Sequence, residues 1–279
     1  MKKCVEHCGC RISYEVRGAG PKVLFIQGVG VHGGGWRPQT VELSARYSCL
    51  TFDNRGMGLS QPVGAPVTVG QMAEDARAVL DAEGWEAAHV VGHSLGGLVA
   101  LHLALSERRR VLSLSLLCTF AGGRAAAPLT RRMLWLGLRS KVGTRRMRRR
   151  GFMQLVLPPG AAAGDETLAG ELAGLFGHDL ADQPPIAGAQ LRAMRAADAS
   201  AKLGGLIGVP TLVVSAAHDP IAPPAAGRAL AAAIPGARYV EAPDASHGLP
   251  ITHAGWVNRL LDEHLSAAEL SQPLPGKVA

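Results

Sequence analysis

Short apolar runs separated by glycine- and proline-containing turns dominate the first 120 residues of the chain and return after residue 205. The run Lys22 to Gln27 (KVLFIQ) is apolar almost throughout and stops at a glycine-rich loop from Gly28 to Gly35. Continuous runs of this length are typical of strands buried on both faces of a parallel sheet. Further strands are expected at Arg11–Arg17, Ser48–Asp53, His89–Val91, Val111–Cys118, Thr211–Ser215 and Tyr239–Glu241.

Helical patterns alternate with these strands. Thr68 is a suitable N-cap for a helix that extends to about Glu83, because apolar residues recur after it at a spacing near 3.6. Other helices are expected at Leu95–Leu105, Ala225–Ile234 and Thr252–Leu265. The alternation predicts an α/β protein with a mostly parallel, twisted sheet flanked by helices.

The pattern changes after Phe120. Residues 121–205 lack strand-like runs and are expected to form several helices broken by Gly and Pro. We therefore predict one α/β core domain made of residues 1–120 and 206–268, a helical insertion at 121–205, and a flexible tail at 269–279.

The net charge of +7 has a local source. Residues 131–150 carry nine Lys or Arg and no acidic residue, and removing these nine from the 29 basic residues leaves 20 against 22 acidic ones. The basic run is interpreted as a solvated helix face, with attraction of anionic substrates or a membrane surface as an alternative. Nucleic-acid binding is not expected, because no nucleic-acid-binding motif accompanies the run.

Composition favours a cytoplasmic protein. No stretch of about 18 apolar residues predicts a membrane span, and the first residues lack the apolar segment of a secretory signal. Five cysteines are an odd number, which fits a disulfide framework poorly. Cys4, Cys8 and Cys10 lie close to His7, but no second Cys/His pair follows at short spacing, so we expect reduced thiols on a first β-hairpin and no metal.

Candidate chemistry centres on the segment Gly92-His93-Ser94-Leu95-Gly96, which links an expected strand to an expected helix. A serine in a sharp strand-to-helix turn has strained backbone geometry, and glycines two positions away on either side make room for it. The turn presents the Ser94 hydroxyl at the sheet edge, beside backbone N–H groups at the start of the helix. The pattern predicts a nucleophilic serine.

Together with this turn, the segment Asp53-Asn54-Arg55-Gly56-Met57-Gly58-Leu59-Ser60 resembles the α/β-hydrolase superfamily, in the branch of carboxylesterases, enol-lactonases and C–C bond hydrolases. The resemblance covers residues 20–120 and 205–268. It implies an α/β-hydrolase fold in which helices inserted at 121–205 form a cap that sets substrate choice. Relatives that carry aspartate in place of Ser94 are haloalkane dehalogenases and epoxide hydrolases, so a serine implies acyl-enzyme chemistry.

A serine nucleophile needs a base, and in this fold the order along the chain is serine, acid, histidine. His247 lies between the last expected strand and the last helix, where that base belongs. Asp219 follows the strand Thr211–Ser215 and is expected to orient His247. Asp244 is a rival acid that would need an awkward local loop, and the alternative acid position after Val111–Cys118 contains no carboxylate.

The resemblance also implies an oxyanion hole made by the backbone N–H groups of Val29 and Leu95. The family usually has His-Gly where this chain has Gln27-Gly28, and a glutamine amide can brace the loop in a similar way. Trp36 is expected either to wall the acyl pocket or to belong to the core. His93 is a second candidate for the substrate pocket, although its place in the turn makes it a poor proton shuttle.

These features predict a carboxylic-ester hydrolase, with lactones as a further substrate class, that forms an acyl-enzyme on Ser94 and needs no cofactor. The same residues would serve a C–C bond hydrolase or a cofactor-free perhydrolase, and a non-catalytic ligand-binding protein is a further alternative. We do not expect a dinucleotide site at Gly28-Val29-Gly30. The expected partner is a small ester or lactone, and the expected state is a monomer or homodimer without stable membrane insertion.

Overall fold

The computed structural model describes residues 2–125, 131–161 and 164–271. Within them, eight strands form one sheet in the order β1-β2-β4-β3-β5-β6-β7-β8. β1, β2 and β4 are joined by antiparallel pairing, and the remaining neighbours are parallel. The strands are β1 (Lys2–His7), β2 (Cys10–Arg17), β3 (Lys22–Ile26), β4 (Ser48–Phe52), β5 (Ala88–His93), β6 (Val111–Leu117), β7 (Thr211–Ala216) and β8 (Arg238–Ala242). The predicted mostly parallel sheet and the first β-hairpin are confirmed.

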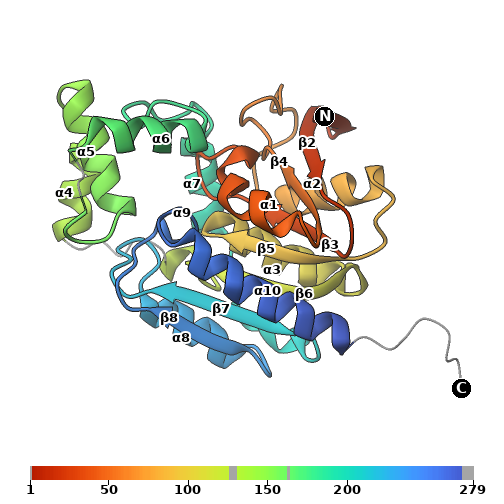
Figure 1. The fold of residues 1–279 in the computed structure, drawn as a ribbon. Coiled ribbons are helices and arrows are strands. Elements are labelled where there is room, and N and C mark those ends of the chain that lie inside the picture. The colour runs from red at the N-terminus through yellow and green to blue at the C-terminus, as the bar shows by residue number, and fades with distance from the viewer. Residues whose placement is uncertain (1, 126–130, 162–163, 272–279) are drawn as a thin grey trace, which may run out of the picture.

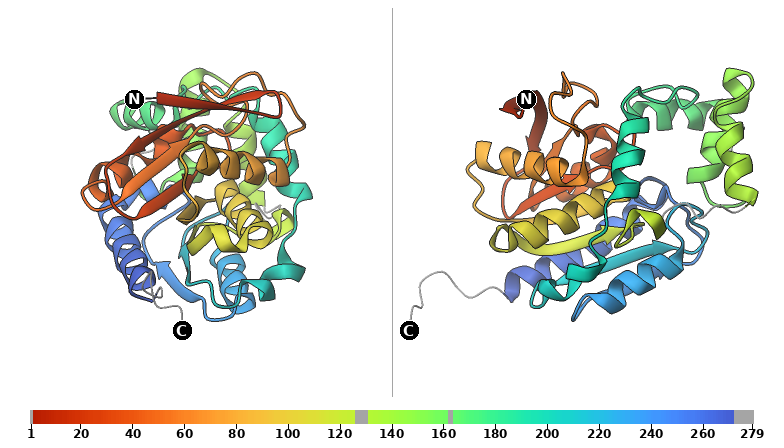
Figure 2. Two further views of the ribbon diagram at one scale, coloured as in Figure 1. Left: turned by 90° about the vertical axis from the view of Figure 1, so that its right-hand side faces the viewer. Right: turned by 180° about the vertical axis from the view of Figure 1, so that it is seen from behind.

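Helices cover both faces of the sheet (Figures 1 and 2). One face carries α1 (Arg37–Leu43) and α10 (Ala254–Leu270), which pack against each other. The other carries α2 (Val69–Ala82), α3 (Leu95–Ser106) and α8 (Pro224–Ala233). Most of α3 is buried because it is apolar on all sides and lies between the sheet and α2. This burial fixes the helix that begins directly after Ser94.

The helical insertion, residues 121–205, lies between β6 and β7. It contains α4 (Arg131–Arg139), α5 (Arg145–Val156), α6 (Glu166–Phe176) and α7 (Ala187–Ala196), and its last residues begin a 3-10 helix, η4 (Ser200–Leu206). In its described residues the only strand-like feature is an isolated bridge between Gly122 and Asp198. The insertion has a small hydrophobic core of its own, which Val31 from the glycine-rich loop joins. α4 and α5 project farthest from the sheet (Figures 1 and 2).

Two parts of the chain differ from expectation. The glycine-rich loop leads into a 3-10 helix, η1 (Gly33–Trp36), and then α1, because Pro38 starts a short helix whose buried side meets α10. The predicted tail begins too early: Glu269 and Leu270 belong to α10, and the Glu269 carboxylate lies 2.6 Å from Nε2 of His89. The rest of that tail, residues 272–279, lies outside the described residues.

A last helix, α9 (Leu249–Thr252), is a single turn just before α10. Among the helices of the described residues, none has the length and apolar character needed to cross a membrane.

Candidate active site

Ser94 lies in the sharp turn between β5 and α3. Its backbone has φ 56° and ψ −121°, a conformation that a residue with a side chain rarely adopts. The flanking glycines permit it: a Cβ on Gly92 would come within 2.4 Å of the Gly96 carbonyl oxygen, and one on Gly96 within 2.0 Å of the Ile26 carbonyl oxygen. The spacing of glycines around Ser94 therefore has the steric cause expected from the sequence.

Three predicted site residues meet at the carboxyl ends of parallel strands. Oγ of Ser94, after β5, lies 3.0 Å from Nε2 of His247, and Nδ1 of His247 lies 2.7 Å from Oδ2 of Asp219. All three side chains are buried. An ionised carboxylate can only accept, so Nδ1 of His247 carries the proton and Nε2 is free to accept the Ser94 hydroxyl proton.

Asp219 is held by its own loop, just after β7. Its Oδ1 accepts hydrogen bonds from the backbone N–H groups of Ile221 and Ala222, at 2.7 and 2.8 Å. These two bonds leave Oδ2 directed at His247. The rival Asp244 is exposed, and its carboxylate lies 3.4 Å from Nε2 of His253. The geometry thus favours Asp219 as the partner of His247.

The loop after β3 passes close to the nucleophile. A Cβ on Gly28 would lie 3.2 Å from Cβ of Ser94, a tight contact that glycine avoids. Within the described part of the chain, the backbone N–H groups of Val29 and Leu95 have no protein acceptor. Gln27 braces this loop as expected, because its Oε1 accepts from the Gly28 N–H at 3.2 Å.

Side chains of the insertion hold the same loop at Gly30. Oε1 of Gln190, on α7, accepts from the Gly30 N–H at 2.9 Å, and Nε2 of His178 donates to the Gly30 carbonyl at 2.9 Å. On the His247 side, the Gly248 N–H donates to the Val156 carbonyl at 2.7 Å. Sequence reasoning did not identify these residues, since partners so far apart in the sequence leave no local signal.

His93, the second candidate for the substrate pocket, lies beside His247. Its Nε2 donates to the backbone carbonyl of His247 at 2.9 Å, and the two imidazole rings pack with centroids 4.8 Å apart. Burial, followed by the nearby His247, lowers the pKa of His93 to about 3. His93 is therefore neutral at ordinary pH, and its contacts position the backbone of His247.

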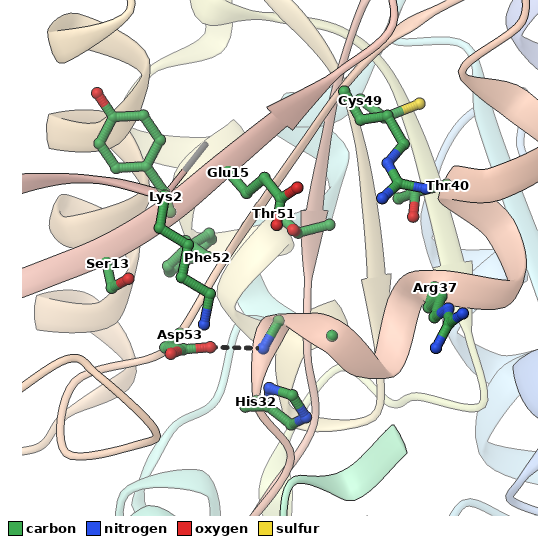
Figure 3. Close-up of a pocket in the computed structure, with 14 residues that line it drawn as sticks. Lys2, Ser13, Glu15, His32, Arg37, Thr40, Cys49, Thr51, Phe52 and Asp53 are labelled. Atoms are coloured by element: carbon green, nitrogen blue, oxygen red, sulfur yellow. Dashed lines mark hydrogen bonds between the residues drawn. The ribbon is translucent and has the colours of Figure 1, made fainter. Parts of the chain in front are cut away.

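Trp36 belongs to the core, the second of the two roles expected for it. It is fully buried, its ring packs against Phe25, and its edge meets His93. A separate cavity of about 160 Å³ lies beside β2, β4 and η1 (Figure 3). Its lining includes none of Ser94, Asp219 and His247. At its edge Asp53 accepts from the Gly33 N–H at 2.7 Å and the Leu59 N–H at 2.9 Å, which ties the Asp53–Ser60 turn to η1.

Cys118 directly follows β6 and was not foreseen as part of the site, because it was expected to be the last residue of that strand. Its thiol is buried, and burial together with the nearby Asp219 carboxylate holds its pKa well above the usual value. Cys118, His93 and His247 bring possible metal-ligand atoms within 4.8 Å of one another. A metal ligand must be deprotonated and free to bind, whereas the Cys118 thiol is protonated and the His247 imidazole is hydrogen-bonded to Ser94 and Asp219. These residues therefore make a poor metal site.

A second group of three possible ligands is formed by His7, Cys8 and Glu74 in the β1–β2 hairpin and α2. Nδ1 of His7 is bonded to Asp75 at 2.7 Å, and Asp75 also receives two hydrogen bonds from Arg55. These contacts anchor the hairpin to α2 and account for the His7 position without a metal.

Comparison with known proteins gives a consistent result. Residues 21–254 match the family model described as alpha/beta hydrolase fold. The chain is 31% identical over 252 residues to the "Putative carbamate hydrolase RutD" of Azorhizobium caulinodans, covering 89% of this chain and 92% of that protein. It is 29% identical to the "Putative non-heme bromoperoxidase BpoC" of Mycobacterium tuberculosis, covering 85% and 90%.

Among solved structures, the enol-lactonase from Burkholderia xenovorans superposes with a TM-score of 0.80 at 27% identity, covering 95% of this chain and all of that one. A hydrolase from Pseudomonas aeruginosa gives a TM-score of 0.79 at 26% identity, covering 95% and 98%. The sequence match over most of the chain, the sheet order and these superpositions agree. The chain is a hydrolase that belongs to the α/β-hydrolase family.

Proposed function

We propose that this protein hydrolyses carboxylic esters, lactones included, through an acyl-enzyme formed on Ser94. The observation that carries the proposal is the continuous hydrogen-bonded line from Ser94 through His247 to Asp219. A hydroxyl in contact with an imidazole, which is itself oriented by a buried carboxylate, is the arrangement that activates serine for attack on carbonyl carbon.

In the first half of the reaction, Oγ of Ser94 attacks the ester carbonyl while Nε2 of His247 takes the hydroxyl proton. Asp219 stabilises the resulting imidazolium and keeps Nδ1 protonated. His247 then donates its proton to the departing alcohol oxygen as the C–O bond breaks. In the second half, His247 deprotonates a water molecule that attacks the acyl-enzyme, and returns the proton to Ser94 Oγ.

The negative charge that develops on the carbonyl oxygen needs hydrogen-bond donors. The backbone N–H groups of Val29 and Leu95 have no protein acceptor in the described chain, and they belong to segments that meet beside Ser94. We assign them to the oxyanion hole, where each donor contributes about 3 kcal/mol to transition-state stability. Because Gln190 and His178 hold Gly30, the insertion contributes to the position of Val29.

The test is turnover of short p-nitrophenyl esters and simple lactones by the wild type and by Ser94→Ala. Loss of a triad serine should lower kcat by about 10⁶-fold. Ser106→Ala, at the far end of α3, is the matched control and should keep wild-type turnover. A fluorophosphonate probe should label the wild type and not Ser94→Ala. Wild-type-like hydrolysis by Ser94→Ala would refute the proposal, and an unlabelled, inactive wild type would support a non-catalytic ligand-binding protein.

Carbamates are a second candidate substrate class, because several relatives about 31–33% identical over most of the chain are described as carbamate hydrolases. The attacking residues and the oxyanion hole would be the same, since a carbamate also presents a carbonyl carbon with a leaving group. A panel that pairs each ester with the carbamate of the same alcohol separates the two, because only the acyl side differs.

C–C bond hydrolysis and perhydrolysis would use the same three residues. The bromoperoxidase relative gives perhydrolysis the sequence support. Bromination of monochlorodimedone by bromide, hydrogen peroxide and a short carboxylic acid tests it, because a peracid formed by the enzyme would oxidise the bromide. We also propose a cytoplasmic location, which is supported by five cysteines that are all free. The proposed partner is a small-molecule substrate, and the proposed state of the protein is a monomer or a homodimer.

A further inference from the structure

A stripe of large apolar side chains lies exposed along α4 and the turn after it. The exposed fractions are 58% for Leu134, 51% for Trp135, 60% for Leu138 and 57% for Val142. Leu134, Leu138 and Val142 are spaced four residues apart, so they extend along one side of the helix and into the turn. We call these four residues, with the neighbouring cations Arg131, Arg139 and Lys141, the α4 patch. Exposed apolar residues gathered in this way mark an interaction surface.

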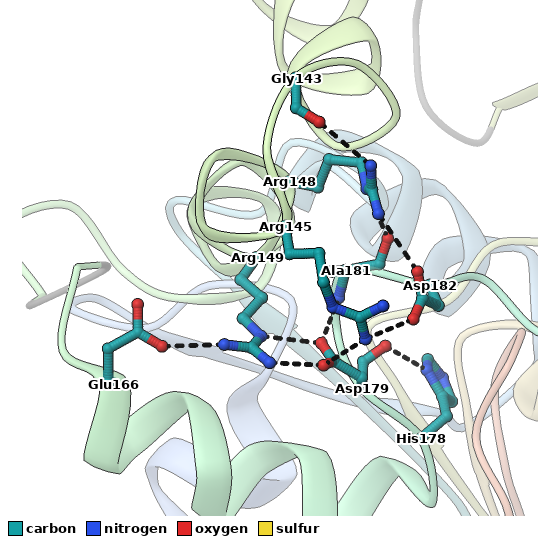
Figure 4. Close-up of polar contacts among 9 residues, drawn as sticks. All are labelled: Gly143, Arg145, Arg148, Arg149, Glu166, His178, Asp179, Ala181 and Asp182. Atoms are coloured by element: carbon teal, nitrogen blue, oxygen red, sulfur yellow. Dashed lines mark hydrogen bonds and ion pairs between the residues drawn. The ribbon is translucent and has the colours of Figure 1, made fainter.

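The described cations of the basic run differ in their pairing. Four of the five arginines of α5 have ion pairs within the chain, and Arg150 has none with a described residue. Arg145 contacts Asp179 and Asp182, and Arg149 contacts Asp179 and Glu166, at 2.5–3.0 Å (Figure 4). By contrast, the three cations of the α4 patch have no ion pair with any described residue. The Arg139 guanidinium lies over the Trp135 ring at 5.3 Å from its centroid. The α4 patch thus offers positive charge and apolar surface together.

We propose that the α4 patch docks the protein on the surface of an anionic lipid bilayer. Leucine and tryptophan side chains enter the boundary between headgroups and acyl chains, while arginine and lysine contact the lipid phosphates. α4 and α5 form the outermost part of the insertion, so a flat surface can approach them without meeting the sheet or its helices (Figures 1 and 2). This inference is independent of the proposed function, because it involves none of the residues around Ser94.

Other occupants fit the patch less well. Two copies placed face to face would bring Arg131, Arg139 and Lys141 of one against the same cations of the other, which is unfavourable. A nucleic acid would match the charge but would leave the four apolar side chains without an apolar partner. An anionic bilayer matches both the charge and the apolar stripe.

The experiment uses the full-length Ser94→Ala protein, so that lipid hydrolysis cannot affect the result. Cosedimentation compares vesicles of phosphatidylcholine with vesicles that also contain phosphatidylglycerol. Binding is expected to the anionic vesicles only, and to weaken as salt is raised to about 1 M, where the Debye length falls to about 3 Å. Trp135 gives a direct readout because the other three tryptophans are buried or half-buried. Its emission should shift to shorter wavelength on binding, and Trp135→Phe should abolish most of that shift.

Two pairs of variants separate the apolar and charged contributions. Arg131→Gln with Lys141→Gln should weaken binding about 30-fold, since each cation near such a surface contributes about 1 kcal/mol. The control Arg259→Gln removes an exposed cation of α10 and should change binding by less than about fivefold. Leu134→Ser with Leu138→Ser should abolish binding, whereas Ile207→Ser, at a residue 70% exposed elsewhere, should not.

The proposal is wrong if the Ser94→Ala protein does not bind anionic vesicles. It is also wrong if Arg259→Gln and Ile207→Ser weaken binding as much as the α4 variants do. A dimer in sedimentation velocity that Leu134→Ser with Leu138→Ser dissociates would assign the patch to a second copy and overturn the lipid assignment. Far-ultraviolet circular dichroism and the thermal midpoint of each variant establish that it is folded.

Discussion

The sheet and the insertion hold the candidate active site in different ways. Ser94 and Asp219 follow β5 and β7, inner strands whose side chains are almost all buried and which are held on both sides by ladders of parallel hydrogen bonds. The insertion contacts the loops of the site through single hydrogen bonds, which join Gln190 and His178 to Gly30 and the Val156 carbonyl to the Gly248 N–H. Its helix α5 is joined to the loop at Asp179 by ion pairs (Figure 4).

The sheet therefore fixes the position of the nucleophile, whereas the insertion adjusts the loops around it. Moving Ser94 would require a rearrangement of β5 and α3, which costs many buried contacts at once. Moving Val29 would change the two hydrogen bonds that join the neighbouring Gly30 to the insertion, which involves far fewer contacts. Substitutions in the sheet should therefore abolish the chemical step, whereas substitutions in the insertion should change its rate by smaller factors and leave the nucleophile in place.

The largest expected effect tests the sheet side. Asp219→Asn keeps the size of the side chain but removes the charge that favours the Nδ1–H form of His247. We expect kcat on the best ester substrate to fall about 10⁴-fold with little change in KM. Asp244→Asn is the matched control and should retain wild-type kcat, because Asp244 is exposed and contacts His253. Equal losses in the two variants would contradict the assignment of Asp219.

A smaller effect tests the link between the insertion and the oxyanion loop. Gln190→Met keeps a buried side chain of similar length and removes the acceptor for the Gly30 N–H. Because the Ser94, His247 and Asp219 contacts remain, we expect kcat to fall about 10-fold to 100-fold, with fluorophosphonate labelling of Ser94 still complete at long times. Gln39→Met, which removes a buried hydrogen bond to the Pro250 carbonyl instead, is the control. A wild-type kcat in Gln190→Met would mean that the insertion does not position the loop.

The same difference explains what the sequence could reveal. The turn around Ser94 was predictable because its glycines and its flanking strand and helix lie within about twenty residues, and His247 and Asp219 followed from their order after particular strands. Gln190, His178 and Val156 gave no signal, since a helix pattern does not state which distant loop it contacts. Cys118 gave no signal either, because it ends an apolar run and was expected to be part of the strand Val111–Cys118.

A third prediction concerns the ion pairs of the insertion. Arg149 and then Arg145 hold the pKa of Asp179 well below its usual range, so this carboxylate contributes stability above its unfolded pKa and loses it in acid. Asp179 is partly exposed, which keeps the contribution small. Asp179→Asn should lower the thermal midpoint by about 2 °C at neutral pH. It should also speed trypsin cleavage within residues 131–150, while kcat stays within about twofold of the wild type. Asp262→Asn removes a surface ion pair with Arg46 in the α/β core domain and should leave that cleavage unchanged.

The smallest effect belongs to a titrating group inside the core. His264, on α10, donates from Nε2 to the Leu114 carbonyl at 3.0 Å, and burial lowers its pKa to about 4. Between pH 6.5 and about 4 the unfolded chain binds a proton at this residue that the folded chain does not, so stability falls as the pH falls. His264→Gln keeps a donor for Leu114 but cannot titrate. In urea unfolding it should lower the slope of the free energy of unfolding against pH, over this interval, by at most about 1.4 kcal/mol per pH unit. Because His93 and His89 are also neutralised by burial, part of the slope should remain. An unchanged slope would mean that His264 is protonated in the folded core, and a titration of its ring protons by NMR would locate that proton directly.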